Sequence, residues 1–148
     1  MLDDIDIKLL KTLQQEGRTK RNQLAELVGL SVPSVSDRLK KLEENKIIEG
    51  YYAKVNRIAF GLDILAYIHV IMESSKHYKS LITRVDKKPE ILECHSVLGK
   101  GSHLIKVLVK NTEALEKLLG EIQSWPGVIS TRTTFVLSTI KETTAINI

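Results

Sequence analysis

NQLAELVGLSVPSVSDRLKKLEEN, residues 22–45, is the stretch that decides the fold of the first third of the chain. It divides into two short helical patterns on either side of Gly29, where a left-handed helix end is easiest for glycine. Ser31 is a good N-cap for the second helix, and Pro33 falls in its first turn, where the missing N–H costs nothing. Two short helices joined by a tight turn that contains glycine are typical of a helix-turn-helix.

The second helix of this pair has a narrow apolar stripe formed by Val35, Leu39 and Leu42. Polar residues lie opposite the stripe, and a helix with hydroxyls, an acid and cations suits the major groove of duplex DNA. The surrounding segment 18–41 holds six cations and only two acids. We therefore predict that the DNA-binding residues are Arg18, Arg21, Ser31, Ser34, Ser36, Asp37, Arg38, Lys40 and Lys41. On spacing alone, an amphipathic hairpin of another helical domain, with solvated charges, is an equally good interpretation.

The residues on either side of this segment extend the first domain. An apolar stripe that includes Ile5 and Leu9 marks a preceding helix, which is the third helix needed to bury the pair. Residues 47–55 are rich in β-branched and aromatic types, so we predict an extended segment that serves as a wing or a hinge. We place a helix-turn-helix domain at residues 1–55 and a linker at residues 56–63.

The second domain, residues 64–148, follows a different rhythm. Strand patterns occupy residues 64–73, 90–98, 103–110 and 128–138, and helical stripes occupy residues 78–85 and 115–122. This βαββαβ order predicts a ferredoxin-like sandwich with helices on one face of the sheet. Because both faces of the first strand are apolar, the second face must pack against another copy. We predict an α+β protein with a winged-helix-like N-terminal domain, assembled as a dimer that extends to a tetramer or octamer.

Composition excludes several other classes of protein. The 148 residues have a net charge of +4, which favours an anionic partner only weakly. The single cysteine, Cys94, excludes an internal disulfide and suits a reducing compartment. No signal peptide opens the chain, and the longest apolar run is too short to span a membrane. Histidine spacing typical of metal sites, nucleophile triads and phosphate loops are missing. We predict a cytoplasmic protein that is not an enzyme, with no metal, no cofactor and no membrane partner.

A turn between two predicted strands is the strongest candidate for a small-molecule site. Its two glycines let backbone N–H groups approach a small anion, and its serine adds a hydroxyl. Threonines on the last strand supply further hydroxyls. The predicted effector-binding residues are Gly99, Lys100, Gly101, Ser102, Thr133 and Thr134. A plain glycine turn, with threonines selected for β-propensity, explains the same residues, and the residues alone favour that simpler explanation.

Taken together, these motifs resemble the Lrp/AsnC, or feast/famine, family of transcription regulators. Residues 2–10, LDDIDIKLL, are similar to the first helix of the family. Its helix-turn-helix and the strand that follows are similar to residues 24–31, Val35, Arg38, residues 42–43 and residues 47–51. The final strand of its sensing domain is similar to residues 126–128, Thr133, Thr134 and Leu137.

The resemblance implies an N-terminal DNA-binding domain and a C-terminal domain that dimerises and senses amino acids in a cleft between dimers. Many members have Gly-x-Tyr-Asp in the turn, where this chain has Gly101 and Ser102 at the last two positions. We therefore predict a sequence-specific regulator that binds double-stranded DNA and responds to a small amino-acid effector. The alternative is a small-molecule-binding or metabolic protein whose helical half makes protein contacts, and a test of duplex binding separates the two.

Overall fold

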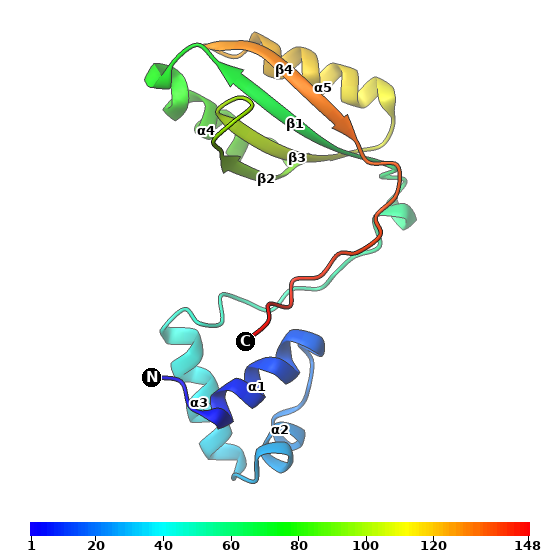
Figure 1. Cartoon of the computed structure of the whole chain (residues 1–148). Coiled ribbons are helices and arrows are strands. Elements are labelled where there is room, and N and C mark those ends of the chain that lie inside the picture. The colour runs from blue at the N-terminus through cyan, green and yellow to red at the C-terminus, as the bar shows by residue number, and fades with distance from the viewer. The chain divides into compact units, whose positions relative to one another are not determined.

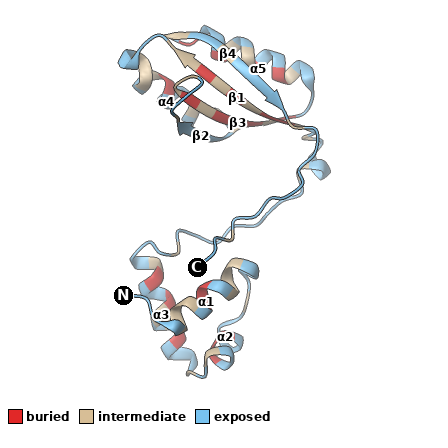
Figure 2. Ribbon diagram, in the orientation of Figure 1, coloured by how far each residue is buried: buried red, intermediate tan, exposed pale blue.

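Three helices build the N-terminal unit in the computed structural model, which describes residues 1–148. They are α1 (Asp4–Gln15), α2 (Arg21–Val28) and α3 (Val32–Glu44) (Figure 1). Each helix turns one apolar stripe inward, and the core residues are Leu9, Leu10, Leu24, Ala25, Val35, Leu39 and Leu42. Figure 2 shows these buried positions on the inner sides of the helices. The predicted helix-turn-helix is therefore confirmed.

Local capping explains where these helices begin and end. The Asp3 carboxylate accepts a hydrogen bond from the backbone of Asp6, and the Asp6 side chain accepts one from the backbone of Asp3. Such a reciprocal pair satisfies two orphan N–H groups of the first turn. Gly29 ends α2 with a φ of 68°, and Ser31 caps α3 through a hydrogen bond from the backbone of Ser34. Both predicted caps of the helix pair are confirmed.

The segment after α3 differs from the prediction of an extended strand. Residues 47–55 contain no strand, and the chain has no wing hairpin at this place. The N–H groups of Ile47 and Ile48 instead donate to the Leu42 carbonyl, at 2.9 and 3.1 Å. Lys46 adopts a φ of 58°, the left-handed conformation common just after a helix. β-Branched residues favour a strand only where a partner strand completes the ladder, and no other segment of the chain pairs here.

The chain divides into two units whose boundaries differ in part from those predicted. One unit contains Met1–Lys54 together with Lys141–Ile148, and the other contains Val55–Ile140. The predicted linker at residues 56–63 includes a short 3-10 helix, η1 (Arg57–Phe60), and lies in the second unit. The prediction places residues 141–148 in the second domain, but in the structure they group with the helical unit.

Hydrogen bonds explain this grouping of the C-terminal segment. The Gln14 side-chain amide donates to the Ile146 carbonyl at 3.0 Å and accepts from the Ile146 N–H at 2.6 Å. Lys54 and Glu142 form an ion pair at 2.7 Å. An amide that bonds both main-chain groups of one residue acts as a two-point clamp. We refer to this contact as the Gln14 clamp.

The second unit is a four-stranded sheet with two helices on one face (Figure 1). Its elements are β1 (Ile64–Met72), η2 (Ser75–His77), α4 (Tyr78–Asp86), β2 (Ile91–Ser96), β3 (His103–Val109), α5 (Thr112–Ser124) and β4 (Val128–Phe135). The strand order is β2-β3-β1-β4, and every neighbouring pair is antiparallel. This arrangement confirms the predicted ferredoxin-like sandwich. No helix in either unit is long and apolar enough to cross a membrane.

The two faces of the sheet differ in how they are covered. On the helix side, Ala66, Ile68 and Val70 of β1 are fully buried, against apolar side chains of α4 and α5. Because strand residues alternate between faces, the other side presents the intervening residues. We name this side the open face. The register assigns to it Tyr67, His69 and Ile71 of β1, Glu93 and His95 of β2, Leu104, Lys106 and Leu108 of β3, and Arg132 and Thr134 of β4.

Candidate DNA-binding face and effector turn

The outward face of α3 is the first candidate site. Burial of Val35, Leu39 and Leu42 in the helical core fixes which side of α3 faces solvent. The predicted DNA-binding residues that α3 exposes there are Ser34, Asp37, Lys40 and Lys41, while Ser36 is half-buried. The Ser34 hydroxyl lies 2.8 Å from that of Ser31, so the two form a linked pair at the start of the helix. The helix thus presents polar side chains on a rigid support, as a helix that enters a groove requires.

The lysines of α3 are paired with acids one turn away. Lys41 lies 2.9 Å from Asp37, and Lys40 lies 3.7 Å from Glu44. The hydrogen bond from Lys41, with its charge, holds the pKa of the Asp37 carboxyl below its ordinary value. Exposed i,i+4 pairs contribute little to stability, so a phosphate can replace the acid at little cost. The lysines remain available for DNA.

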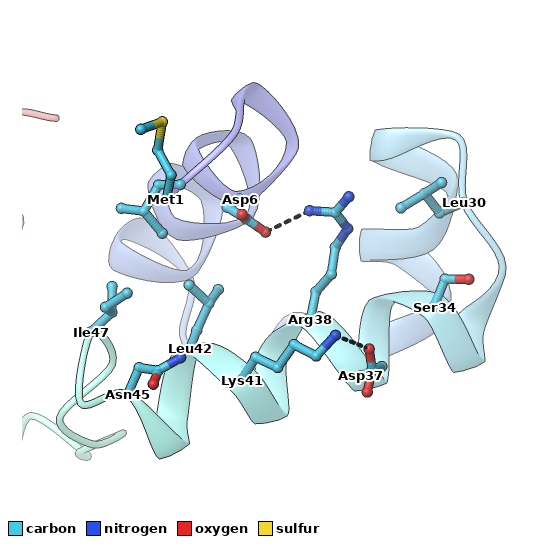
Figure 3. A pocket seen from close by; sticks show the side chains of 11 residues that line it. Met1, Asp6, Leu30, Ser34, Asp37, Arg38, Lys41, Leu42, Asn45 and Ile47 are labelled. Atoms are coloured by element: carbon cyan, nitrogen blue, oxygen red, sulfur yellow. Dashed lines mark hydrogen bonds and ion pairs between the residues drawn. The ribbon is translucent and has the colours of Figure 1, made fainter.

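Arg38 occupies a different environment from the other predicted DNA-binding residues. Its Nη1 donates to Asp3 and to Asp6, each at 2.8 Å, and its side chain is only 29% exposed. Figure 3 shows the side chain reaching from α3 toward Asp6 on α1. The hydrogen bond from the Asp6 backbone, followed by that from Arg38, holds the pKa of Asp3 below its ordinary value. In this structure Arg38 therefore ties α3 to the start of α1, and we name this contact the Arg38 clamp.

A concavity of about 610 Å³ lies beside the Arg38 clamp, between α3 and the start of α1 (Figure 3). Its lining combines apolar side chains, Leu2, Leu30 and Ile47 among them, with the charged groups of the clamp. It is a feature of the helical unit that residue spacing did not predict. In the sequence, the three-residue spacing of Asp3 and Asp6 indicates a helix cap but does not reveal their contact with Arg38. Only the packing of α3 against α1 brings Arg38 to these two carboxylates.

The remaining predicted DNA-binding residues lie outside α3. Arg18 is exposed in the connection between α1 and α2, and Arg21 is the first residue of α2 and is also exposed. Neither forms an ion pair within the chain. Both are therefore free cations of the helical unit, in contrast to Lys40 and Lys41.

The turn between β2 and β3 is the second candidate site, and hydrogen bonds hold it against β1. The Val97 N–H donates to the Ser102 carbonyl at 2.9 Å, and the Ser102 N–H donates to the Val70 carbonyl at 3.0 Å. Gly101 has a φ of 75°, and a Cβ at this position would lie 2.6 Å from the Val70 carbonyl oxygen. Only glycine satisfies both conditions, so the glycine belongs to the turn itself. The N–H groups of residues 98–101 have no backbone acceptor within the chain and remain free for an anion.

The two threonines predicted as effector-binding residues, Thr133 and Thr134, lie on opposite faces of the sheet. Thr133 pairs with Ile68 and lies on the helix side, whereas Thr134 pairs with Tyr67 and lies on the open face. The turn contacts Val70, whose partner on β4 is Thr131. Thr131 itself accepts a hydrogen bond from Gln123 of α5 at 3.0 Å. Within one chain, then, Gly99, Lys100, Gly101 and Ser102 form one group, and the two threonines lie farther along β4.

His103, directly after the turn, was missing from the predicted site residues. It is only 4% exposed, and its Nδ1 lies 2.7 Å from the Ser102 hydroxyl. Its ring meets the ring of Tyr78 edge to face, with 4.8 Å between the centroids. The only signal in the sequence is a histidine directly after a glycine-containing turn. Elsewhere, the chain contains no cluster of three His, Cys, Asp or Glu side chains that could hold a metal ion.

Comparison with known proteins bears on both sites. The family model for the Lrp/AsnC ligand binding domain matches residues 65–146, and that for a winged helix-turn-helix DNA-binding domain matches residues 2–49. The HTH-type transcriptional regulator FL11 of Pyrococcus horikoshii is 35% identical over 99% of this chain and 97% of its own length. The leucine-responsive regulatory protein of Escherichia coli is 35% identical over 95% of this chain and 88% of its own.

Solved structures agree over nearly the whole length. The transcriptional regulator NMB0573 of Neisseria meningitidis, in its complex with L-Met, has a TM-score of 0.94 at 32% identity, covering 99% of this chain and 97% of that one. AsnC of Escherichia coli has a TM-score of 0.91 at 29% identity, covering 98% of each chain. A helix-turn-helix unit followed by a ligand-binding sandwich defines a two-domain DNA-binding regulator. The chain belongs to the Lrp/AsnC family of transcriptional regulators.

Proposed function

We propose that this regulator binds a pseudo-palindromic duplex through the α3 helices of two paired copies, and that an amino acid modulates its binding. We also propose that it acts by binding and not by catalysis, and that it is cytoplasmic. The observation that carries the DNA-binding part is the outward face of α3, where Ser34, Lys40 and Lys41 are exposed on a helix with a fixed inner stripe. Two-fold symmetry requires half-sites about one helical turn apart, or a multiple of it.

Salt dependence of duplex binding tests this part. The double variant Lys40→Ala, Lys41→Ala should weaken binding to every sequence and lower the salt slope by about two, since each lysine releases roughly one counterion. Ser34→Ala should change sequence preference while leaving the slope intact. Lys11→Ala, an exposed lysine on α1, is the matched control and should change neither. A protein with no salt-dependent affinity for any duplex would instead support the alternative, a small-molecule-binding protein whose helical half contacts proteins.

The open face supports assembly into dimers. Its central strands present Tyr67, Ile71, Leu104 and Leu108, which are only half-buried in a single chain. A sheet face of this composition is stabilised when a second sheet covers it, because apolar area is removed from water. We therefore propose that the open faces of two copies pack together and that such dimers join further into tetramers or octamers.

The effector part of the proposal rests on the turn at residues 99–102. The free N–H groups of residues 99–101 suit a carboxylate, and the Ser102 hydroxyl suits an ammonium or a carboxylate. NMB0573, at 32% identity, has been solved as an L-Met complex, which supports an amino acid as the class of ligand. With neutral acceptors for the ammonium in this chain, affinity should be modest, about 10 μM to 1 mM.

Calorimetry with each of the twenty amino acids tests the effector. Lys100→Glu should abolish the heat of binding, because it sets a negative charge beside the ligand carboxylate without altering the glycines. Lys110→Glu, an exposed lysine of the same unit, should bind like the wild type. Gly101 is unsuitable for such a test because any side chain there collides with the Val70 carbonyl. If no amino acid binds at millimolar concentration, the sensing role fails and the DNA-binding role stands.

A further inference from the structure

A buried histidine, His103, follows the effector turn directly and contacts its last residue. His103 is 4% exposed, and the register sets it between Val70 of β1 and Ser96 of β2. From α4, Tyr78 packs edge to face on its ring. The distance of 2.7 Å from its Nδ1 to the Ser102 Oγ is that of a short hydrogen bond. Ser102 is thus held from both sides, by its N–H on Val70 and by its hydroxyl on His103.

No charged group faces the imidazole from any of these elements. The titratable side chain of Tyr78 packs on the ring, Val70 and Ser96 carry no charge, and no charged group contributes to the pKa shift of His103. His77, next in the chain to Tyr78, packs its ring where a Cβ on Gly127 would lie. Burial alone lowers the pKa of His103 below its ordinary value. The imidazole is therefore neutral at physiological pH.

The protonation state of His103 decides which way the Ser102 hydroxyl points. A neutral ring with its proton on Nε2 offers Nδ1 as an acceptor, so that Ser102 donates its proton and keeps its lone pairs free. A protonated ring donates from Nδ1, occupies one lone pair of Ser102 and turns its hydroxyl proton outward. The other acceptor for that proton, the Val70 carbonyl, lies at 3.4 Å, a much longer distance. A neutral His103 with its proton on Nε2 therefore makes Ser102 an acceptor toward other groups.

We propose that His103 is the positioning residue of the effector turn, and that its neutral imidazole, with the proton on Nε2, directs the Ser102 lone pairs toward the ammonium group of the bound amino acid. The inference rests on the proposed effector function of the turn. In this arrangement the Ser102 oxygen accepts a hydrogen bond from the ammonium group, a role that an aspartate in the turn would otherwise fill. It also makes effector binding dependent on pH, since protonation of His103 removes an acceptor and adds a positive charge beside the ammonium.

Calorimetric titrations between pH 7.5 and pH 5 test the proposal, with L-methionine and the amino acid that releases most heat in the screen as probes. Wild-type affinity should be constant at the upper end and fall below the pKa of His103, by up to about tenfold per pH unit. His103→Phe keeps the contact with Tyr78 but has no nitrogen, so it should bind more weakly and lose the pH dependence. His103→Asn offers a non-titrating acceptor near the Nδ1 position, so it should retain more affinity than the phenylalanine variant, with a flat profile.

Two further variants separate positioning from a structural effect. Ser102→Ala should weaken binding and reduce the pH dependence to the part that comes from the charge of protonated His103. Adding Ser102→Ala to His103→Phe should change binding little further, because both remove the same hydrogen bond. His77→Gln, the neighbouring histidine, should keep the wild-type profile. If the wild type binds but its pH dependence survives in His103→Phe, or is undiminished in Ser102→Ala, the proposal is overturned and the effector function stands. A wild type that binds no amino acid at any pH would overturn the effector function and this inference with it.

Discussion

The two candidate sites are built in opposite ways, one from side chains and one from backbone. The face of α3 consists of exposed side chains on a helix whose caps and buried stripe all lie within residues 31–45. The effector turn consists of backbone groups held by Val70, a residue about thirty positions earlier in the chain. Exposed side chains of α3 can change without altering the fold, whereas Gly101 has no tolerated replacement. The residues that contact DNA can therefore vary at little cost in stability, whereas the sequence of the effector turn is constrained by its backbone conformation.

The largest expected effect is the loss of dimer assembly, which tests whether a substitution in the sandwich unit weakens DNA binding by the helical unit. Leu104→Glu puts a charge in the middle of the open face, and we expect it to produce monomers. Affinity for a duplex with two half-sites should fall about 100-fold, because the second helix no longer binds at high effective concentration. Light scattering and duplex titrations measure the two quantities. Ile82→Glu, at a 57% exposed position on α4, is the control, and a dimeric Leu104→Glu protein would contradict the proposed interface.

The next effect concerns the stability of the helical unit. Arg38→Ala should lower the free energy of unfolding by about 1–2 kcal/mol, since it removes two charge-assisted hydrogen bonds to Asp3 and Asp6. Lys40→Ala, which removes only an exposed i,i+4 pair, should cost about 0.5 kcal/mol or less. Denaturant unfolding of the full chain gives both values.

The pH dependence of the Arg38 clamp has a definite sign. The pKa of Asp3 is lowered in the folded protein, so its contribution is present above the unfolded pKa of about 3.9 and is lost as the pH falls through the folded pKa. The difference between wild type and Arg38→Ala should therefore shrink in strong acid. A difference that grows as the pH falls would show that the clamp is not the cause.

A smaller effect, confined to the sandwich, comes from His103. The pKa of this buried imidazole is lowered, so the unfolded chain takes up a proton more readily than the folded one. Stability should be complete above about pH 6.5 and should be lost as the pH falls from there to the folded pKa. Thermal unfolding of His103→Phe should lack this component, and His95→Phe, an exposed histidine on β2, should retain it. Equal pH profiles for wild type and His103→Phe would exclude the assignment.

The smallest effect is expected at the Gln14 clamp. Gln14→Ala removes two hydrogen bonds to the main chain of Ile146 and should make the segment Lys141–Ile148 more accessible to protease. The free energy of unfolding should change by less than about 1 kcal/mol, because the contact is exposed. Gln15→Ala is the adjacent control and should be cleaved at the wild-type rate. Equal cleavage of both variants would mean that the clamp does not hold the segment.

By itself the sequence determined the helix-turn-helix and the βαββαβ order, because the signals for both are short-range. Gly29, Ser31 and Pro33 act within one helical turn, and the apolar spacing of each element is visible along the chain. It also identified the exposed lysines of α3 and the glycines of the turn. It failed at residues 47–55, where β-branched residues predicted a strand, since a strand forms only where a partner completes its ladder.

Tertiary structure alone decided the features that depend on residues far apart in the chain. Arg38, similar in type to its neighbours on α3, lies against α1 because the core packing of three helices brings it to Asp3 and Asp6. Thr133 and Thr134 separate onto opposite faces because the pairing of β1 with β4 sets the register. His103 gained its role from burial against α4 and from its bond to Ser102, neither of which a pattern of residues reveals. The physical reason is common to all three: side-chain identity is a local property, while partner, burial and face are set by long-range packing.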